Sequence, residues 1–191
     1  MALPGFRERT LKGLTMAKNP DAVALLKADH RKVEGLFEKF ENAKGAEAKR
    51  KLVKQICTEL SVHTTIEEEI FYPACKSEVE DDLLKEAYVE HDGAKVLIAE
   101  LLASEPDNEF YDAKVKVLSE EIKHHVKEEE RPGEGVFAQA REAGLDMDTL
   151  GEQMAARKRE LLAEIEGSGI PTQKTRSFVG HKMQQGQPVS G

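Results

Sequence analysis

Residues 52–73 read LVKQICTELSVHTTIEEEIFYP, and they combine a helical pattern with side chains that bind metals. Apolar residues recur every three or four positions, which is the spacing of one helix face. The same stripe then carries a histidine and, one turn later, a glutamate. In order, the stripe holds Leu52, Ile56, Leu60, His63, Glu67 and Ile70. The stretch therefore predicts a helix that aims an imidazole and a carboxylate into an apolar interior.

Three other segments repeat this pattern, each with a histidine on its apolar stripe. Residues 21–43 carry Val23, Leu26, His30, Val33, Phe37 and Phe40. The segment from 77 to 103 carries Leu84, Ala87, His91, Ala94, Ile98 and Leu102. Residues 109–131 carry Val115, Leu118, Ile122, His125 and Glu129. All four segments thus direct a histidine toward the same interior, and two of them add a glutamate.

Four long helices with short connections predict an all-α fold, an antiparallel up-down-up-down four-helix bundle. We expect Asn19 and Pro20 to start the first helix. The second helix is expected to span residues 46–76, and the capping box at Ser77–Glu80 is expected to open the third helix. A short helix over 134–142 and an additional C-terminal helix over 148–166 follow. The predicted organisation is an arm over 1–19, the bundle over 20–142, an accessory helix over 143–166 and a disordered, flexible tail over 167–191.

Composition supports this class and excludes others. The 191 residues are 34% charged and 5% aromatic, without tryptophan, which is typical of long helices and unlike a β-sandwich. The net charge of the chain is −8. Because residues 1–19 and 167–191 each carry a charge of +3, residues 20–166 carry a net charge of −14. Such an acidic body disfavours a nucleic-acid partner. No stretch has the roughly 20 apolar residues of a membrane span, and we expect a cytoplasmic protein with Cys57 and Cys75 as buried thiols.

A metal site explains the polar residues of the stripes. Buried carboxylates and imidazoles are costly unless a cation compensates them. Mixed nitrogen and oxygen donors without thiolate favour iron or manganese, with zinc possible. Six donors are too many for one tetrahedral zinc and suit two ions that share ligands. The candidate ligands are His30, His63, Glu67, His91, His125 and Glu129.

The register of the last motif leaves an alternative open. His124 with Glu128 has the same spacing as His125 with Glu129. The second pair continues the stripe of Leu118 and Ile122, so we favour it.

Together these motifs resemble the hemerythrin-like, or HHE cation-binding, family. The matching features are Asp29-His30, His63-x-x-x-Glu67, His91 and His125-x-x-x-Glu129, over residues 20 to about 142. The resemblance implies a bundle around two non-haem iron ions joined by an oxo or hydroxo bridge. It also implies that the six candidate residues are the iron ligands and that Glu67 and Glu129 bridge the two ions.

The sequence departs from the family's pattern in two places. Lys95 stands where oxygen carriers of the family have a further histidine. One iron would then have either an additional water site or a substitute ligand, for which Glu34 and Tyr88 are candidates. Lys95 itself could bond a metal-bound anion or extend outward. The fourth helix is broken early, at Pro132 and Gly133, which suggests a wider channel beside Glu129.

Three functions are compatible with this site. The first is binding or sensing of a small diatomic, oxygen or nitric oxide, with a role in iron or oxidative-stress handling. The second is a di-iron redox enzyme, namely a ferroxidase or a peroxide or nitric oxide reductase, assisted by Glu68 and Glu128. The third is a purely structural metal site. The expected partners are a diatomic or peroxide, with no nucleic acid and no membrane, and the sequence does not fix the oligomeric state.

Overall fold

The computed structural model describes residues 20–178, and all regular structure within them is helical. The elements are α1 (Ala22–Glu41), α2 (Ala46–Ile66), the π-helical turn η1 (Glu67–Phe71), α3 (Tyr72–Cys75), α4 (Asp81–Leu102), α5 (Tyr111–Glu129), α6 (Val136–Glu142) and α7 (Met147–Ser168). The predicted arm over 1–19 and the end of the predicted tail, 179–191, lie outside the described residues. Among the described helices, none is long and apolar enough to cross a membrane.

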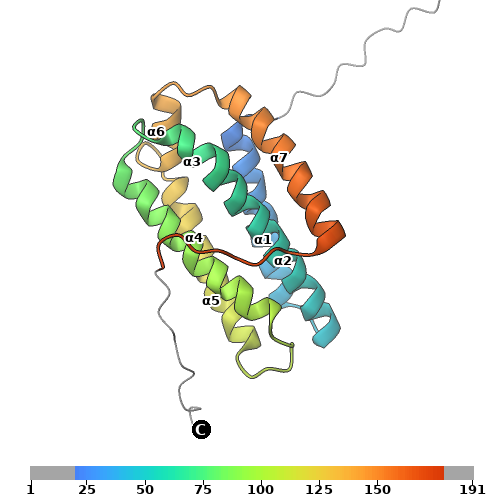
Figure 1. Ribbon diagram of the computed structural model, residues 1–191. Coiled ribbons are helices and arrows are strands. Elements are labelled where there is room, and N and C mark those ends of the chain that lie inside the picture. Colours follow the sequence, from blue (N-terminus) through green and yellow to red (C-terminus); the bar gives the residue numbers. More distant parts are fainter. Residues whose placement is uncertain (1–19, 179–191) are drawn as a thin grey trace, which may run out of the picture.

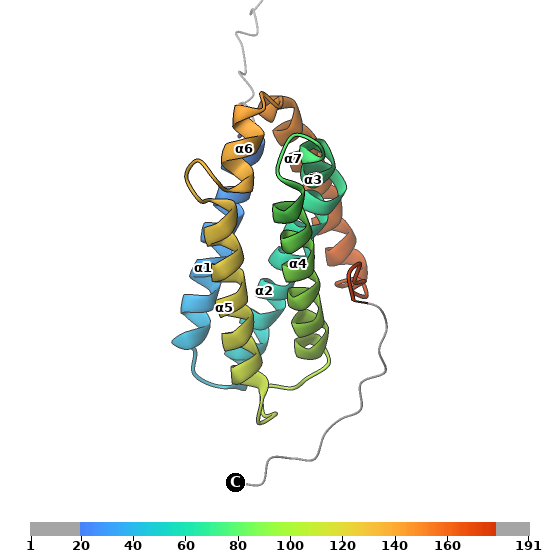
Figure 2. The same cartoon turned by 90° about the vertical axis from the view of Figure 1, so that its left-hand side faces the viewer.

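The predicted four-helix bundle is confirmed. Helices α1, α2, α4 and α5 run alternately down and up, as Figures 1 and 2 show. Within the bundle, α1 packs against α2 and α5, and α4 packs against α5 and α2. All four helices therefore face one common interior.

A layer of buried polar side chains divides the apolar core of the bundle. One apolar cluster lies toward α3, α6 and α7 and includes Leu26 and Phe137. The other lies toward the opposite end and includes Phe37 and Leu118. The predicted stripes are buried at most positions, but Leu102, the last residue of α4, is 43% exposed.

The second helix differs from the expected continuous helix over 46–76. Its backbone slips into a π-helical turn at Glu67–Phe71, where the N–H of Tyr72 bonds the carbonyl of Glu67, five residues back. Such a turn inserts one extra residue and is frequent at functional sites. The slip changes the direction of every side chain that follows Glu67, including Tyr72.

Two expected helix starts also differ from the structure. The predicted capping box at Ser77 does not open a helix, because Ser77 adopts φ 72° and α4 begins only at Asp81. Helix α1 is capped by Asp21, whose carboxylate accepts from the N–H of Ala24 at 2.8 Å. Asn19, the expected cap, lies outside the described residues.

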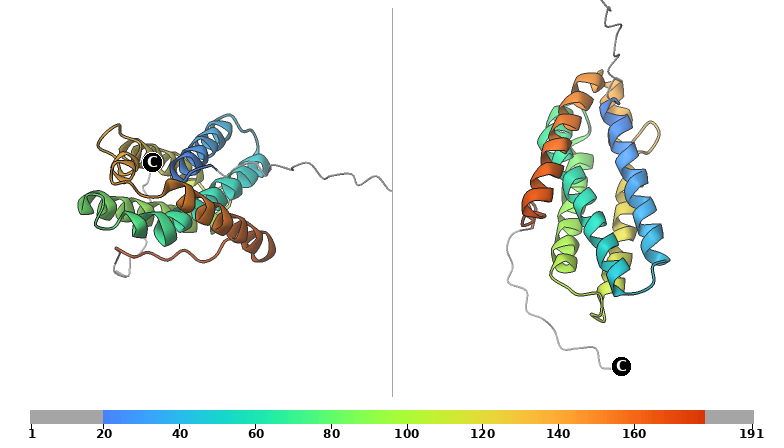
Figure 3. Two further views of the ribbon diagram at one scale, coloured as in Figure 1. Left: turned by 90° about the horizontal axis from the view of Figure 1, so that it is seen from above. Right: turned by 90° about the vertical axis from the view of Figure 1, so that its right-hand side faces the viewer.

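Helix α7 lies on the outside of the bundle, against α1 and α2, as expected of an accessory helix (Figure 3). It approaches the start of α1 closely at Gly151, where an added Cβ would lie 2.4 Å from the carbonyl oxygen of Pro20. A side chain at this position would push the two helices apart.

The segment over residues 169–178, called the strap below, follows α7 and differs from the expected disordered tail. It runs across the outside of the bundle to α4 (Figure 1). There the backbone N–H groups of Arg176 and Ser177 bond the carboxylate of Asp92. Polar contacts with a buried carboxylate therefore give this part of the predicted tail a defined position.

Candidate metal centre

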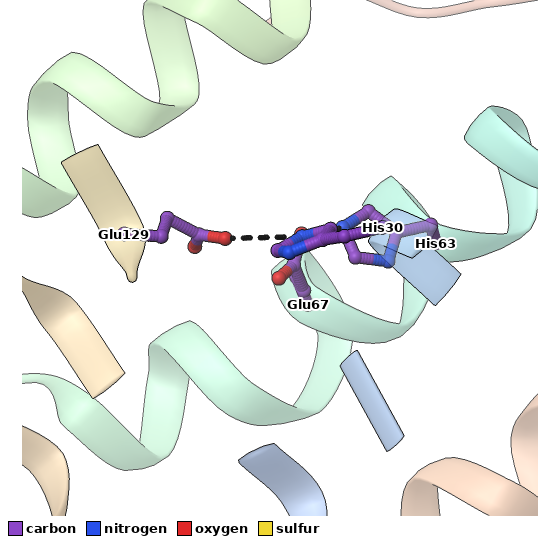
Figure 4. Close-up of side chains that lie close together, drawn as sticks. All are labelled: His30, His63, Glu67 and Glu129. Atoms are coloured by element: carbon purple, nitrogen blue, oxygen red, sulfur yellow. Dashed lines mark hydrogen bonds and ion pairs between the residues drawn. The ribbon is translucent and has the colours of Figure 1, made fainter. Parts of the chain in front are cut away.

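The structure brings all six candidate ligands into the polar layer. His30 comes from α1, His63 from α2, Glu67 from η1, His91 from α4, and His125 and Glu129 from α5. Each is at most 4% exposed. Five elements thus contribute to one enclosed site, as the close-up in Figure 4 shows for four of the residues.

The first half of the centre is formed by α1 and α2. The Nε2 atoms of His30 and His63 lie 3.1 Å apart. Glu67 Oε2 is 3.1 Å from His63 Nε2, and Glu129 Oε2 is 3.5 Å from His30 Nε2. These four donors point toward one another (Figure 4) and form a compact group of a size that fits one cation.

The second half is formed by α4 and α5. The Nε2 atoms of His91 and His125 lie 3.3 Å apart. Glu67 Oε2 is also 3.3 Å from His91 Nε2, and Glu129 Oε2 is 3.4 Å from His125 Nε2. Each carboxylate therefore contacts both histidine pairs, which is the position of a bridging ligand between two ions.

A carboxylate lies near the outer nitrogen of each of the four histidines of the centre. Nδ1 lies 2.8 Å from Glu130 in His30, 3.1 Å from Glu68 in His91, and 2.8 Å from Glu90 in His125. In His63, the corresponding distance to Asp29 is 3.8 Å. In His30, His91 and His125, donation from Nδ1 leaves the lone pair of a neutral ring on Nε2, so these three contacts orient the rings as metal ligands. Nδ1 of His63 has no hydrogen-bond partner.

Electrostatics within the centre are unbalanced without a cation. Burial alone would lower the pKa of His63, but Glu67, Asp29 and Glu129 outweigh it and raise this pKa to about 10. Burial and the charge of Glu67 raise the pKa of Glu129 to about 7. Both oxygens of Glu67 and Oε2 of Glu129 are buried without a hydrogen-bond partner. These orphaned carboxylate oxygens fit a metal ion, which would compensate their charge.

Sequence reasoning missed one residue of the centre, Tyr72. Its hydroxyl donates to Glu129 Oε1 at 2.8 Å and lies 3.3 Å from His91 Nε2. On a regular helix, position 72 would be well off the stripe of His63 and Glu67. The π-helical turn brings it inward, and a tyrosine five residues after the glutamate was the only signal in the sequence.

The structure resolves the register of the last motif. His125 is buried with Glu129, whereas the side chain of His124 is 60% exposed. Glu128 faces outward and pairs with Arg131. The alternative pair thus lies outside the centre.

None of the suggested replacements for the further histidine reaches the centre. Glu34 pairs with Arg31 at the surface, and Tyr88 packs against the ring of Tyr72. Lys95 neither extends outward nor faces the metal positions, because it is buried and donates to Glu68 and Asp92. Glu34 and Tyr88 therefore do not fill the place of the further histidine, whereas the hydroxyl of Tyr72 contacts two of the candidate ligands.

The expected wider channel beside Glu129 is not found. The chain turns back tightly after α5, and a Cβ on Gly135 would lie 2.4 Å from the carbonyl of Glu129. This turn places Phe137 of α6 flat against His30, with 5.8 Å between ring centroids, and Phe137 also contacts Phe71. Aromatic rings therefore cover this end of the centre.

A small cavity borders the centre on its opposite side. Four apolar residues, Val33, Leu60, Ile122 and Val126, line it together with His30, His63, His91 and His125. Its volume is ≈ 10 Å³, which is room for about one water-sized molecule. Asp29 and Thr64 complete the lining, so this small space lies among the candidate ligand histidines themselves.

Comparisons with known proteins find similar folds and sequences. A solved hemerythrin HHE cation-binding domain-containing protein from Mycobacterium kansasii has a similar fold, with a TM-score of 0.66 and 25% identity. That similarity covers 78% of this chain and 94% of the other. A protein named DNA nickase from Nostoc sp. (strain PCC 7120) is 27% identical over 106 residues, which is 56% of this chain but only 30% of the relative.

The family comparison covers the segment that carries the six candidate ligands. The sequence model named hemerythrin HHE cation binding domain matches residues 21–132. With the His and Glu clusters of the interior, this match identifies a metal-binding protein. The chain belongs to the hemerythrin HHE cation-binding domain family.

Proposed function

We propose that the protein holds two non-haem iron ions, joined by an oxo or hydroxo bridge, and uses them to bind or sense a small diatomic. The observation that carries the metal part is the double use of Glu67. This residue belongs both to a cluster with His30, His63 and Glu129 and to a cluster with His91 and His125. A shared carboxylate between two imidazole pairs supports two neighbouring ions rather than one.

The donor set favours iron. Imidazole and carboxylate donors without thiolate suit iron or manganese better than the ions that prefer oxygen alone or sulfur. Both cysteines are buried in the apolar clusters rather than in the polar layer. Iron bound by these donors would supply reversible redox chemistry and affinity for small ligands. The chain itself holds the donors in place and excludes bulk water.

The cavity supports a diatomic ligand. Its volume of ≈ 10 Å³ excludes organic substrates. Beside the histidines, Asp29 and Thr64, its wall holds the apolar residues Val33, Leu60, Ile122 and Val126, which suit a small apolar molecule. Oxygen and nitric oxide are both small and apolar. Binding or sensing one of them, with a role in iron or oxidative-stress handling, is the function that this cavity fits best.

A redox enzyme that reduces peroxide or nitric oxide, or oxidises ferrous iron, is the second candidate, and Tyr72 is the observation in its favour. The phenol is 1% exposed and carries a proton beside both Glu129 and His91. Glu68 does not fill this role, because it is bonded to His91 and Lys95 away from the metal positions. A proton donor at the centre is what reduction of peroxide requires.

The net charge of the bundle and its two thiols bear on the partner and on the compartment of the protein. The nickase named among the relatives is a much longer protein, and this chain carries −14 over residues 20–166. We therefore propose that the protein acts without a nucleic-acid partner. We also propose that it works in the cytoplasm, where Cys57 and Cys75 stay reduced.

The test is a ligand titration of the reduced protein, followed by absorption spectroscopy. Oxygen and nitric oxide should each change the spectrum at a stoichiometry set by the metal content. The variant Leu60→Phe should weaken this binding, because the larger side chain takes up the cavity. The metal content of the variant is measured alongside, because four of the candidate ligands line the same cavity. Leu60→Met conserves volume and serves as the control. Continuous turnover of peroxide would instead favour the enzyme, and a spectrum indifferent to every ligand would contradict both proposals.

A further inference from the structure

The chain beyond the family match returns to the centre at two separate places. The match ends at residue 132, whereas α7 and the strap occupy residues 147–178. Neither element contributes a candidate ligand. Each nevertheless contacts a carboxylate that faces a ligand histidine from outside.

The first contact comes from α7. The ammonium group of Lys158 donates to Asp29 Oδ1, and the side chain of Asp29 is only 8% exposed. The other oxygen of Asp29 lies 3.8 Å from Nδ1 of His63. Neither of these two atoms has a hydrogen-bond partner, so a small shift would join them. Lys158 thus holds the one carboxylate available to orient His63.

The second contact comes from the strap. Oδ2 of the fully buried Asp92 accepts from the N–H of Arg176 at 2.7 Å and from the N–H and hydroxyl of Ser177 at 2.5 and 2.7 Å. Oδ1 of Asp92 accepts from Lys95 at 3.3 Å. The carboxylate of Asp92 is therefore compensated mainly by the strap.

Lys95 links this contact to the centre. Besides Asp92, its ammonium donates to Glu68 at 2.6 Å, and Glu68 lies 3.1 Å from Nδ1 of His91. The guanidinium of Arg176 adds a contact at 3.7 Å to Glu68. If the strap donors were lost, Asp92 would compete for Lys95, since a buried carboxylate without donors is costly. Glu68 would then hold His91 less firmly.

The two contacts end on different halves of the centre. Lys158 acts through Asp29 on His63 in the first half, and the strap acts through Asp92, Lys95 and Glu68 on His91 in the second. We propose that Lys158 and the strap residue Ser177 are positioning residues, each of which secures the metal ion of one half. This inference rests on the proposed two-metal centre.

The test measures how fast each metal ion leaves the full-length, iron-loaded protein. An excess of a coloured ferrous chelator is added under reducing conditions, and release is followed by absorbance. Ser177→Pro removes both the N–H and the hydroxyl that bond Asp92, and Ser177→Ala removes only the hydroxyl. Lys158→Met removes the ammonium of α7. Matched controls are Lys85→Met, which removes an exposed lysine, and Gln173→Ala within the strap.

Ser177→Pro and Lys158→Met should each release about one iron per chain about tenfold faster than wild type, while the other iron leaves at the wild-type rate. The two control variants should release both ions at the wild-type rate. Loss of a direct partner of a metal ligand costs about 10–100-fold in metal affinity. We expect the lower end of that range here, because Lys158 and Ser177 act through a partner rather than on the ligand itself. Ser177→Ala should have a smaller effect in the same direction. The double variant of Ser177→Pro and Lys158→Met should release both ions fast. Circular dichroism of the metal-free forms checks folding, and Ser177→Ala decides the matter if the proline variant does not fold.

Unchanged release in the variants would overturn the inference, as would equal acceleration of both ions by each single variant. A slow ion that persists in the double variant would show that both contacts act on the same half and would also overturn it. The readout is separate from ligand binding. Wild type that retains two ions but binds no diatomic refutes the proposed function alone, whereas diatomic binding with unchanged release refutes this inference alone.

Discussion

The hydroxyl of Tyr72 should stabilise the metal-free protein by a measurable amount. It donates at 2.8 Å to Glu129 Oε1, and both groups are almost fully buried. Tyr72→Phe leaves that oxygen without a donor, while Oε2 of Glu129 already has none. A buried hydrogen bond to a charged group contributes about 2 kcal/mol. In a chain of this size, that loss corresponds to a decrease in Tm of about 4–8 °C.

The assay is thermal unfolding of the metal-free protein by circular dichroism at pH 8, above the pKa of about 7 of Glu129, so that the carboxylate is charged. The matched control is Tyr111→Phe, which removes a hydroxyl from an equally buried ring packed against Phe40 in the other apolar cluster. A Tyr72→Phe protein as stable as this control would refute the reasoning. It would mean that the phenol lies in the centre without bonding Glu129.

Three further predictions concern packing, thiols and acid. Gly151→Ala should lower the free energy of unfolding by about 1–3 kcal/mol in a denaturant titration, because the added Cβ meets the carbonyl of Pro20. The control is Gly167→Ala, on the same helix, where nothing lies near an added Cβ. This change should raise the free energy of unfolding by up to about 1 kcal/mol. Burial raises the pKa of the thiols of Cys57 and Cys75 to about 12, so both thiols are protonated at pH 8. They should react with Ellman's reagent only after the protein unfolds. Fast reaction of the native protein would contradict their burial. Metal retention after dialysis should fall as the pH drops below about 10 and more steeply below about 7, because metal-free His63 and Glu129 take up protons with pKa values of about 10 and about 7. Retention independent of pH would argue against these ligands.

Periodicity alone predicted the bundle and the six polar residues of its interior. The stripes predict which side chains face inward, because a regular helix repeats every 3.6 residues. The choice of His125 over His124 followed from the same rule, through Leu118 and Ile122. Where the backbone stays regular, the sequence was sufficient.

The sequence-based predictions failed where the helical backbone is irregular or where segments far apart in the chain meet. The π-helical turn at Glu67 rotates Tyr72 inward, and no local rule of spacing announces that slip. Lys95 was expected to extend outward, but its partner Glu68 comes from η1 and its partner Asp92 is held by the strap. Such contacts join segments far apart in the chain, and composition carries no information about them. Composition therefore predicted a disordered tail where the strap lies.

The central claim is a centre of two iron ions bridged by Glu67 and Glu129. The most direct test is the metal content of the purified protein together with its near-ultraviolet absorption before and after reduction. We expect about two iron ions per chain, with charge-transfer bands that bleach on reduction. Absence of iron, or a single zinc ion without such bands, would contradict it.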